Sequence, residues 1–413
     1  MTTKIFKNAL TVLFCALLWA CNDEPEPLVP EPVGPDNPQP EQPTEPEKPS
    51  EPEIKNPRTV LLYIVADNSL GRGDYDSDDL REIHLALADK PIDGRLVVYH
   101  SRPGTDTGTH PVLYEIVSSD ATQDVELKAY PDDPSVYSTD ESRMREVLDD
   151  VRQLAPARDY GIIFWSHATG WRSEDGQAKS PMMRSFGDDR RHRMKITTMA
   201  RTLRGYDNSF IYFDCCLMAT AEVFYELRDC AKIIAASGAE VHAEGMPYNI
   251  TLPYFFTEGE ADIEGVARAT FEYYDARTGS DRWSTQTVVE TSRLNDFADA
   301  TAALMSRNVT PPAHTTSVQS YSPTRSYRIF DMEDYLEQSD GIAPEQLETW
   351  RAALSSAIIY KAATPKVNGS HSIRHYCGMA CNIVADPEDA FVSGYNELAW
   401  WRDVVSRNPF YQQ

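Results

Sequence analysis

Two stretches of sequence decide the fold, GIIFWSHATGW at 161–171 and FIYFDCCLMATAEVFYEL at 210–227. Each begins as an apolar run rich in β-branched and aromatic residues, which predicts a buried parallel strand. The first run ends at His167, and the second ends at Cys215 and Cys216. Because ligands bind beyond the carboxyl ends of parallel strands, we expect these side chains to face one crevice. An imidazole beside a thiol there would form a nucleophile–base pair.

The flanking sequence extends this pattern into a large α/β domain. Strands are expected at 60–67, 95–100, 111–117 (at a sheet edge), 161–167, 210–215 and 232–241. Helices are expected at 76–89, 140–154, 196–204, 219–229, 261–277 and 294–307. Such alternation predicts an α/β/α sandwich with a mainly parallel central sheet.

The alternation weakens after residue 310, so we divide the folded part into a core at 58–310 and a C-terminal subdomain at 311–413. This second part contains an expected helix at 344–362 and an expected strand at 375–385. Its aromatic tail, around Trp400 and Trp401, is expected to pack on the core as an extension of it.

The N-terminus carries a targeting signal. Lys4 and Lys7 precede an apolar run at 9–20 that is too short to span a bilayer and is typical of a secretory signal. The run ends in Leu-Trp-Ala-Cys at 18–21, which resembles a bacterial lipobox. We therefore predict a signal peptide at 1–21, lipidation of Cys21 and a place in the bacterial cell envelope, periplasmic or on the outer-membrane surface. An ordinary signal with a chance cysteine is the alternative.

Residues 22–57 have a different composition, with twelve prolines and ten acidic residues. Such a stretch buries too little apolar surface to fold, so it is predicted to be a disordered tether. The lipid would then be the protein's only attachment to the membrane.

The chain's 413 residues carry a net charge of −25, which argues against nucleic acid and favours protein or peptide partners with basic residues. Five cysteines remain after Cys21, and this odd, clustered set is not a disulfide framework. We expect a monomer.

The two deciding stretches resemble the clostripain family of caspase-like cysteine peptidases. Members carry Trp-x-His-x-x-Gly-Trp and then Phe-Asp-x-Cys-Leu-Met, which here read WSHATGW at 165–171 and FDCCLM at 213–218. The segments 66–68 (Ala-Asp-Asn) and 245–248 (Gly-Met-Pro-Tyr) also fit. The resemblance implies a caspase-like fold and a cysteine endopeptidase that cleaves after Arg or Lys.

Carried over by motif, Cys216 is the nucleophile and His167 is its proton acceptor and donor. The oxyanion would be bound by the backbone N–H groups of Cys216 and Ala168. The second of these positions is usually glycine in caspase-like enzymes, and alanine resists positive φ. Cys215 is expected to point to the opposite face of the strand.

The resemblance places Asp214 at the floor of the primary specificity pocket, where a carboxylate would pair with a basic side chain. A second acid often comes from the loop after the next strand. Glu240 and Glu244 are candidates, and Glu244 is the better placed. A solvated loop acid is the alternative for Glu244.

The polar loop at 171–196 contains seven Lys or Arg residues, and relatives are cut into two chains in this interval. We predict self-cleavage after Lys179 or Arg184; an ordinary surface loop is the alternative. Some relatives require calcium, but no calcium-binding motif is present, so no metal site and no cofactor are assigned.

Two other functions compete with this interpretation. Ala168 and the unusual loop at 243–248 favour a catalytically inactive surface lipoprotein that binds peptides or proteins. A serine hydrolase using Ser166 or Ser237 would need a Gly-x-Ser-x-Gly elbow, which neither serine has.

Overall fold

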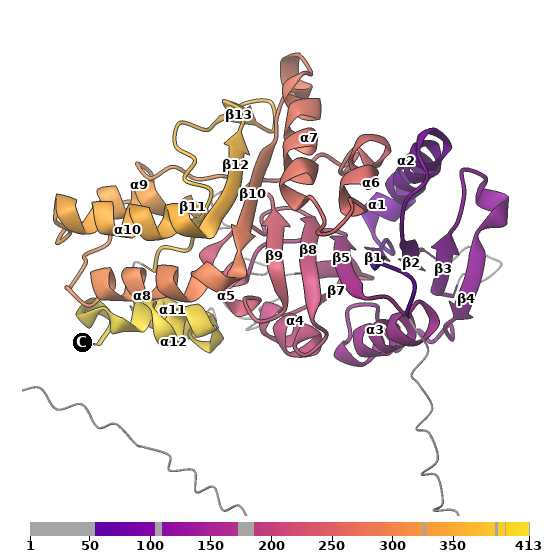
Figure 1. The fold of residues 1–413 in the computed structure, drawn as a ribbon. Helices are drawn as coiled ribbons and strands as arrows, with labels where there is room; N and C mark the ends of the chain where they lie inside the picture. Colours follow the sequence, from indigo (N-terminus) through magenta and orange to yellow (C-terminus); the bar gives the residue numbers. More distant parts are fainter. Residues whose placement is uncertain are drawn as a thin grey trace, which may run out of the picture. The chain divides into compact units, whose positions relative to one another are not determined.

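A nine-stranded sheet forms the centre of this computed structural model, in the order β12-β10-β9-β8-β5-β1-β2-β3-β4 (Figure 1). The structure describes residues 54–103, 110–171, 186–324, 328–384, 387–392 and 394–412. The strands of the sheet are β1 Arg58–Val65, β2 Arg95–Ser101, β3 Val112–Ile116, β4 Val125–Ala129, β5 Asp159–Trp165, β8 Asn208–Asp214, β9 Ala231–Ala236, β10 Thr285–Glu290 and β12 Ile358–Ala363. The central five, β9-β8-β5-β1-β2, are parallel, and antiparallel strands flank them at both ends.

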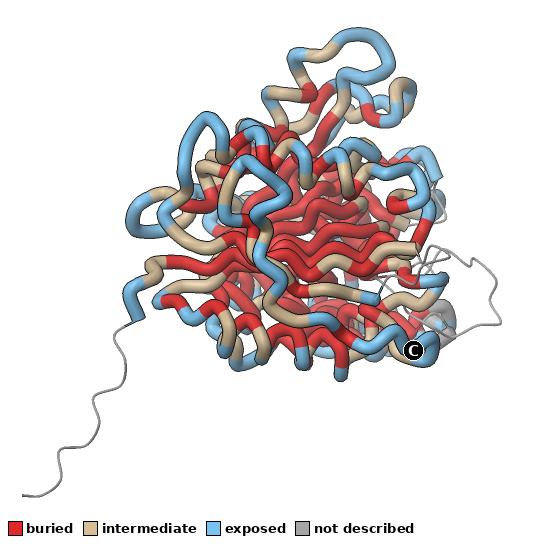
Figure 2. Tube along the Cα trace, turned by 90° about the vertical axis from the view of Figure 1, so that its right-hand side faces the viewer, coloured by how far each residue is buried: buried red, intermediate tan, exposed pale blue. Residues whose placement is uncertain are grey.

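Helices cover both faces of the sheet (Figure 1). One face packs against α2 Tyr75–Asp89, α6 Tyr248–Phe255 and α7 Ile263–Asp275. The other packs against α3 Glu141–Leu154, α4 Ile196–Leu203, α5 Ala221–Glu226, α8 Leu294–Met305 and α10 Pro344–Ala357. Alternate residues of β1 enter these two cores, since Leu61 and Tyr63 lie in one and Leu62 and Ile64 in the other. Figure 2 shows the strands buried between the helical layers. The predicted α/β sandwich with a large, mainly parallel sheet is therefore confirmed.

The remaining elements are short. They are α1 Ser69–Arg72, the hairpin of β6 Phe186–Asp189 and β7 His192–Met194, α9 Met332–Glu337, α11 Pro387–Val392 and α12 Ala399–Asp403. Two pairs of two-residue strands also occur, β11 Phe330–Asp331 with β15 Ala380–Cys381, and β13 Lys366–Val367 with β14 His371–Ser372.

Several sequence-based boundaries were wrong, each because tertiary pairing outweighed local pattern. The strand expected at 111–117 is not at the edge, since β4 pairs with its outer side. The helix expected at 344–362 ends at Ala357, after which the chain becomes β12 and pairs with β10. The strands expected at 375–385 and 232–241 shrink to β15 and β9, and the helix expected at 219–229 shrinks to α5.

The chain from residue 53 onward forms one compact unit. The C-terminal part shares its core: Trp400 of α12 stacks on Phe297 of α8 with ring centroids 5.7 Å apart. Trp171, which follows the first motif strand, is fully buried and lies 4.7 Å from the ring of Tyr395. The boundary at 310 stays a prediction, and the predicted signal and most of the tether lie outside the described residues.

Candidate active site

Strand register brings the two motifs side by side. β5 and β8 pair in parallel with Trp165 opposite Asp214, so His167 and Cys216 each lie two residues beyond the same point of the sheet. A Cβ placed on Gly170 would come within 3.0 Å of the carbonyl oxygen of Leu217. The segment after His167 thus runs against the segment after Cys216.

The two adjacent cysteines have different surroundings. Cys215 is buried, its Sγ donates to the carbonyl of Phe164 at 3.1 Å, and burial raises its pKa well above the usual range. Cys216 is partly exposed, and its Sγ accepts the N–H of Val241 at 3.2 Å. A donor directed at sulfur stabilises a thiolate more than a thiol. Cys216 is therefore the thiol suited to nucleophilic chemistry, and Cys215 is a core residue.

His167 is held by the start of α1. The Oγ atom of Ser69 lies 2.8 Å from His167 Nε2. Ser69 is itself positioned by Asn68, whose side-chain oxygen caps α1 by accepting the N–H of Leu70 at 2.8 Å. Sequence reasoning noticed the Ala-Asp-Asn segment but gave Ser69 no role, since nothing in its pattern points to histidine.

The backbone beside Cys216 is strained. Leu217 adopts φ 65°, a left-handed conformation that is rare for a bulky side chain, and its N–H donates to Ala239 at 2.9 Å. Ala168 is not among the residues with positive φ, which fall instead at Gly170 and Leu217. The expected conflict between alanine and positive φ is therefore absent. In the described part of the chain, no acceptor is found for the Ala168 N–H.

Asp214 ends β8 as a buried carboxyl. Its Oδ2 accepts the N–H of Met246 at 3.0 Å and the hydroxyl of Tyr248 at 3.1 Å, and burial raises its pKa to about 6. A second acid, Asp79 of α2, lies nearby and accepts from Trp165 Nε1 at 2.6 Å. Sequence reasoning missed Asp79, because α2 carries several acids and no pattern separates the buried one.

One glycine joins the two carboxyls. A Cβ on Gly245 would lie 2.9 Å from Asp214 Oδ2 and 3.0 Å from Asp79 Oδ2. The two oxygens therefore face the same small space. Within the described ranges, no Lys or Arg forms an ion pair with Asp79 or Asp214. This buried negative charge is left for a cation from outside.

The other predicted acids lie differently. Glu244 is exposed and pairs with Arg277, just after α7, at 2.5 Å. Glu240 is half-buried and accepts from the hydroxyl of Ser322 at 2.6 Å. These contacts neither support nor contradict the prediction that Glu240 or Glu244 is the second acid of the specificity pocket.

Some predicted positions fall outside the described residues, namely Lys179, Arg184 and Cys21.

In the part of the chain that the structure covers, no group of three or more His, Cys, Asp or Glu side chains is arranged to hold a metal ion. None of the described helices has the length and apolar character needed to cross a membrane.

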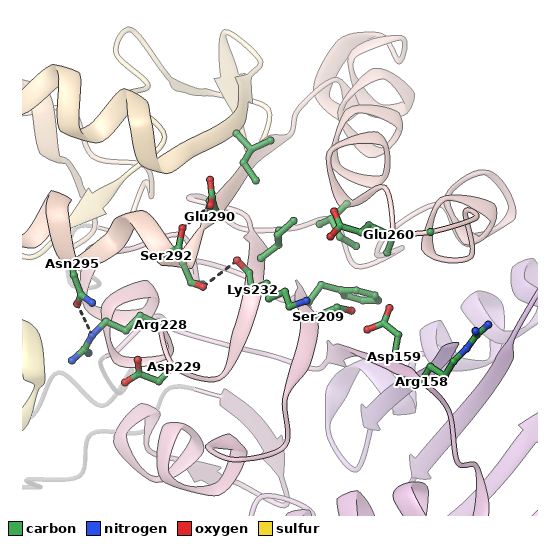
Figure 3. Close-up of a pocket in the computed structure, with 17 residues that line it drawn as sticks. Arg158, Asp159, Ser209, Arg228, Asp229, Lys232, Glu260, Glu290, Ser292 and Asn295 are labelled. Carbon is green, nitrogen blue, oxygen red and sulfur yellow. Dashed lines mark hydrogen bonds between the residues drawn. The ribbon is translucent and has the colours of Figure 1, made fainter. Parts of the chain in front are cut away.

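A surface cavity of about 710 Å³ lies at the opposite end of the sheet (Figure 3). Its lining includes Asp159, Ser209 and Lys232, which stand at the starts of β5, β8 and β9. His167 and Cys216 lie beyond the far ends of these strands. The cavity is therefore separate from the candidate active site.

The fold and the paired motifs define a caspase-like α/β cysteine peptidase scaffold. A family model described as the clostripain family, Peptidase_C11, matches residues 62–396. The chain belongs to the clostripain family, as the two motifs predicted.

Solved structures agree with this assignment. An inactive zymogen C11 protease from Parabacteroides distasonis is similar with a TM-score of 0.73 and 27% identity, covering 86% of this chain and 99% of that one. A secreted C11 cysteine protease from Bacteroides thetaiotaomicron, "iotapain", has a TM-score of 0.71 and 22% identity, covering 85% and 99%. A structure of a secreted C11 cysteine protease from the same organism, with an irreversible peptide inhibitor, has a TM-score of 0.69 and 24% identity, covering 84% and 98%. No curated protein matches the chain.

Proposed function

We propose that this chain is a lipid-anchored cysteine endopeptidase that cleaves peptide bonds after Arg or Lys. The observation that carries the specificity is the buried carboxyl pair of Asp214 and Asp79, which stands next to Cys216 without a cation. Such a site favours a basic side chain, because that side chain supplies the missing charge. The similar proteins are cysteine proteases, and one of them was solved with a peptide inhibitor.

In the proposed reaction the Cys216 thiolate attacks the carbonyl carbon of the substrate. Charge then develops on the carbonyl oxygen, which the backbone N–H groups of Cys216 and Ala168 would stabilise. His167 accepts the thiol proton and returns it to the leaving amine. Since Ser69 holds Nε2, proton exchange would take place at Nδ1. Water then hydrolyses the thioester and regenerates the thiol.

Self-cleavage between the two motif strands is part of the proposal. The predicted sites after Lys179 and Arg184 carry basic residues that suit the same carboxyl pair. A cut there would produce two chains, with β5 and β8 remaining paired over Gly161–Trp165 and Phe210–Asp214. Intact mass measured over time should show two fragments for the wild type and a single chain for purified Cys216→Ala.

We also propose export and lipidation of Cys21, with the enzyme acting as a monomer in the bacterial cell envelope. One similar protease is described as secreted. A Cys21→Ser variant should lose the mass of the lipid and leave the membrane fraction. Membrane retention of this variant would contradict the anchor without affecting the peptidase assignment.

The neighbouring cysteines provide a matched test of the peptidase activity. Cys216→Ala should lower kcat/KM for an Arg reporter peptide by at least about 10³-fold, because the nucleophile is removed. Cys215→Ala removes a buried thiol one residue away and should retain activity within a few fold. Equal activity of wild type and Cys216→Ala would overturn the proposal. Binding of Arg peptides by a wild type that never cleaves them would instead support the binding lipoprotein.

A further inference from the structure

Asp79 is the acid of the carboxyl pair to which the sequence assigned nothing. It comes from α2, which covers the same face of the sheet as α6 and α7. It is 2% exposed, and its Oδ2 faces the same point above Gly245 as Asp214 Oδ2. Its one described hydrogen-bond donor is the indole of Trp165, itself on β5. Asp79 is thus fixed toward Asp214 by the strand that leads to His167.

Two carboxylates in so small a buried space do not both ionise readily, because each charge opposes the other and neither is hydrated. Burial and the Asp214 carboxylate together raise the pKa of Asp79 well above the usual range. Burial raises the pKa of Asp214 to about 6. Two buried carboxyls that face one space without a cation therefore favour a proton shared between them in the empty pair.

Other ionisable groups also face this pair. Asp79 interacts with Asp76 and Glu82 of α2, and Asp214 interacts with Glu82, Tyr248, Tyr212, Tyr274 and the Cys215 thiol. Arg277, just after α7, is engaged by Glu244. Asp76 and Glu82 each have one buried carboxylate oxygen without a described partner, but the other oxygen of Asp76 pairs with His100 and Arg102. Glu82 is therefore the neighbouring carboxyl whose proton must be distinguished experimentally from that of Asp79.

We propose that Asp79 is a specificity residue that binds the basic side chain of the substrate jointly with Asp214, and that the pair releases one proton to solvent when that side chain binds. This inference rests on the proposed function and extends it. The guanidinium or ammonium group of the substrate stays protonated when it binds. Its positive charge stabilises the ionised form of both carboxyls, so the pair loses its proton. Two charges then face one cation. Both carboxyls are buried, so the side chain has to displace the turn at Gly245 to reach them.

The proton is measurable without turnover. In a Cys216→Ala background, acetyl-Leu-Arg-amide is titrated at pH 7 in two buffers of different ionisation enthalpy, and its citrulline counterpart serves as the uncharged ligand. The parent should release about one proton with the Arg ligand and about none with citrulline, as expected of a coupled pair. Asp79→Asn keeps an acceptor for Trp165 but has no proton to release. It should release about none and bind the Arg ligand roughly tenfold more weakly.

Asp78→Asn is the matched control. It removes the same charge from the adjacent position of α2, where Asp78 is exposed and pairs with Arg81, and it should leave affinity and proton release unchanged. Glu82→Gln should also preserve the proton release. Undiminished release from Asp79→Asn would overturn the role of Asp79, as would loss of the proton in Glu82→Gln alone.

A measurement on the parent covers the case in which Asp79→Asn does not fold. Affinity for the Arg ligand should rise by up to about tenfold per pH unit around neutrality, relative to citrulline. A flat profile would contradict the shared proton. If the parent does not distinguish Arg from citrulline at any pH, the proposed specificity itself fails, which is a different outcome from a failure at Asp79 alone.

Discussion

The two ends of the central sheet differ in how their charges are balanced. At the amino ends of the strands, the cavity of Figure 3 mixes charges of both signs, and some of these groups have partners: Asp159 pairs with Arg58 at 2.7 Å, and Arg228 donates to Asn295 at 3.0 Å. At the carboxyl ends, Asp79 and Asp214 share one space without a cation. Positive φ occurs at both ends, at Leu217 beside Cys216 and at Asp207 before β8, but aspartate tolerates this conformation better than a bulky leucine. Unbalanced charge and strain therefore mark the chemistry better than cavity volume does.

The sharpest way to break this comparison is to change one group at each end. His167→Ala should lower kcat for an Arg reporter peptide by about 10³-fold, because proton transfer to and from Cys216 is lost. Lys232→Ala changes an exposed residue in the cavity of Figure 3 and should leave kcat/KM within about twofold. A larger loss from Lys232→Ala would place function at the amino end of the sheet.

A glycine at each end offers a second pair. Gly245 has φ +66° and Gly259 has φ +78°, so alanine at either costs about 1–2 kcal/mol of backbone strain. Only at Gly245 does the new Cβ meet carboxylate oxygens, while at Gly259 it meets nothing within 4 Å. Gly245→Ala should therefore lower kcat/KM for Arg peptides by at least about tenfold, and Gly259→Ala should not. Melting temperatures measured alongside separate stability from activity.

The pH dependence sharpens the contrast in charge. Ionised Asp214 is the form that binds a cation, and burial raises its pKa to about 6. Protonation on the acid side removes the charge, so kcat/KM for an Arg peptide should fall more steeply below pH 6 than near neutrality, by up to about tenfold per unit for each carboxyl that must lose a proton. Dividing by the rate for a citrulline peptide cancels the titration of Cys216 and His167. A ratio that stays constant from pH 5 to 8 would contradict ionisation of Asp214 as the source of preference.

The smallest expected effect concerns Ser69. Ser69→Ala removes the hydroxyl 2.8 Å from His167 Nε2 and should lower kcat by roughly three- to tenfold with little change in KM, because the ring loses an orienting contact. Ser69→Thr keeps a hydroxyl and should recover most of the rate. A change confined to KM would indicate that Ser69 contacts substrate and does not orient the histidine.

Sequence patterns predicted the central strands and long helices because each has a strong period of its own. β1, β5 and β8 contain continuous apolar runs at 60–65, 161–165 and 210–213, as expected of strands buried on both faces. β10 and β12 were missed for the opposite reason. Thr285–Glu290 is half polar, and Ile358–Ala363 follows α10 with no helix-breaking residue between them. Only their mutual pairing makes them strands.

The residues of the candidate site also fall into two groups, those that the sequence indicated and those that it did not. His167 and Cys216 could be expected at one crevice because each follows a recognisable strand, whereas Asp214 was assigned by resemblance to the family motif. Asp79 and Ser69 could not be predicted, since both come from the segment after β1, whose acids at 74, 76, 78 and 79 look alike in sequence. Folding buries Asp76 and Asp79 and leaves Asp74 and Asp78 exposed. Which acid meets Asp214 depends on how α2 packs against α6, and local sequence does not encode that.

Trp171 gives the proposed self-cleavage a thermodynamic consequence. The shorter product would end soon after this residue, yet its indole is fully buried against Tyr395, which belongs to the longer product. The contacts that join the two products would exist before the peptide bond is cut. The mature enzyme would then be a heterodimer assembled without a bimolecular encounter, and dilution would separate its chains only as fast as these buried contacts open.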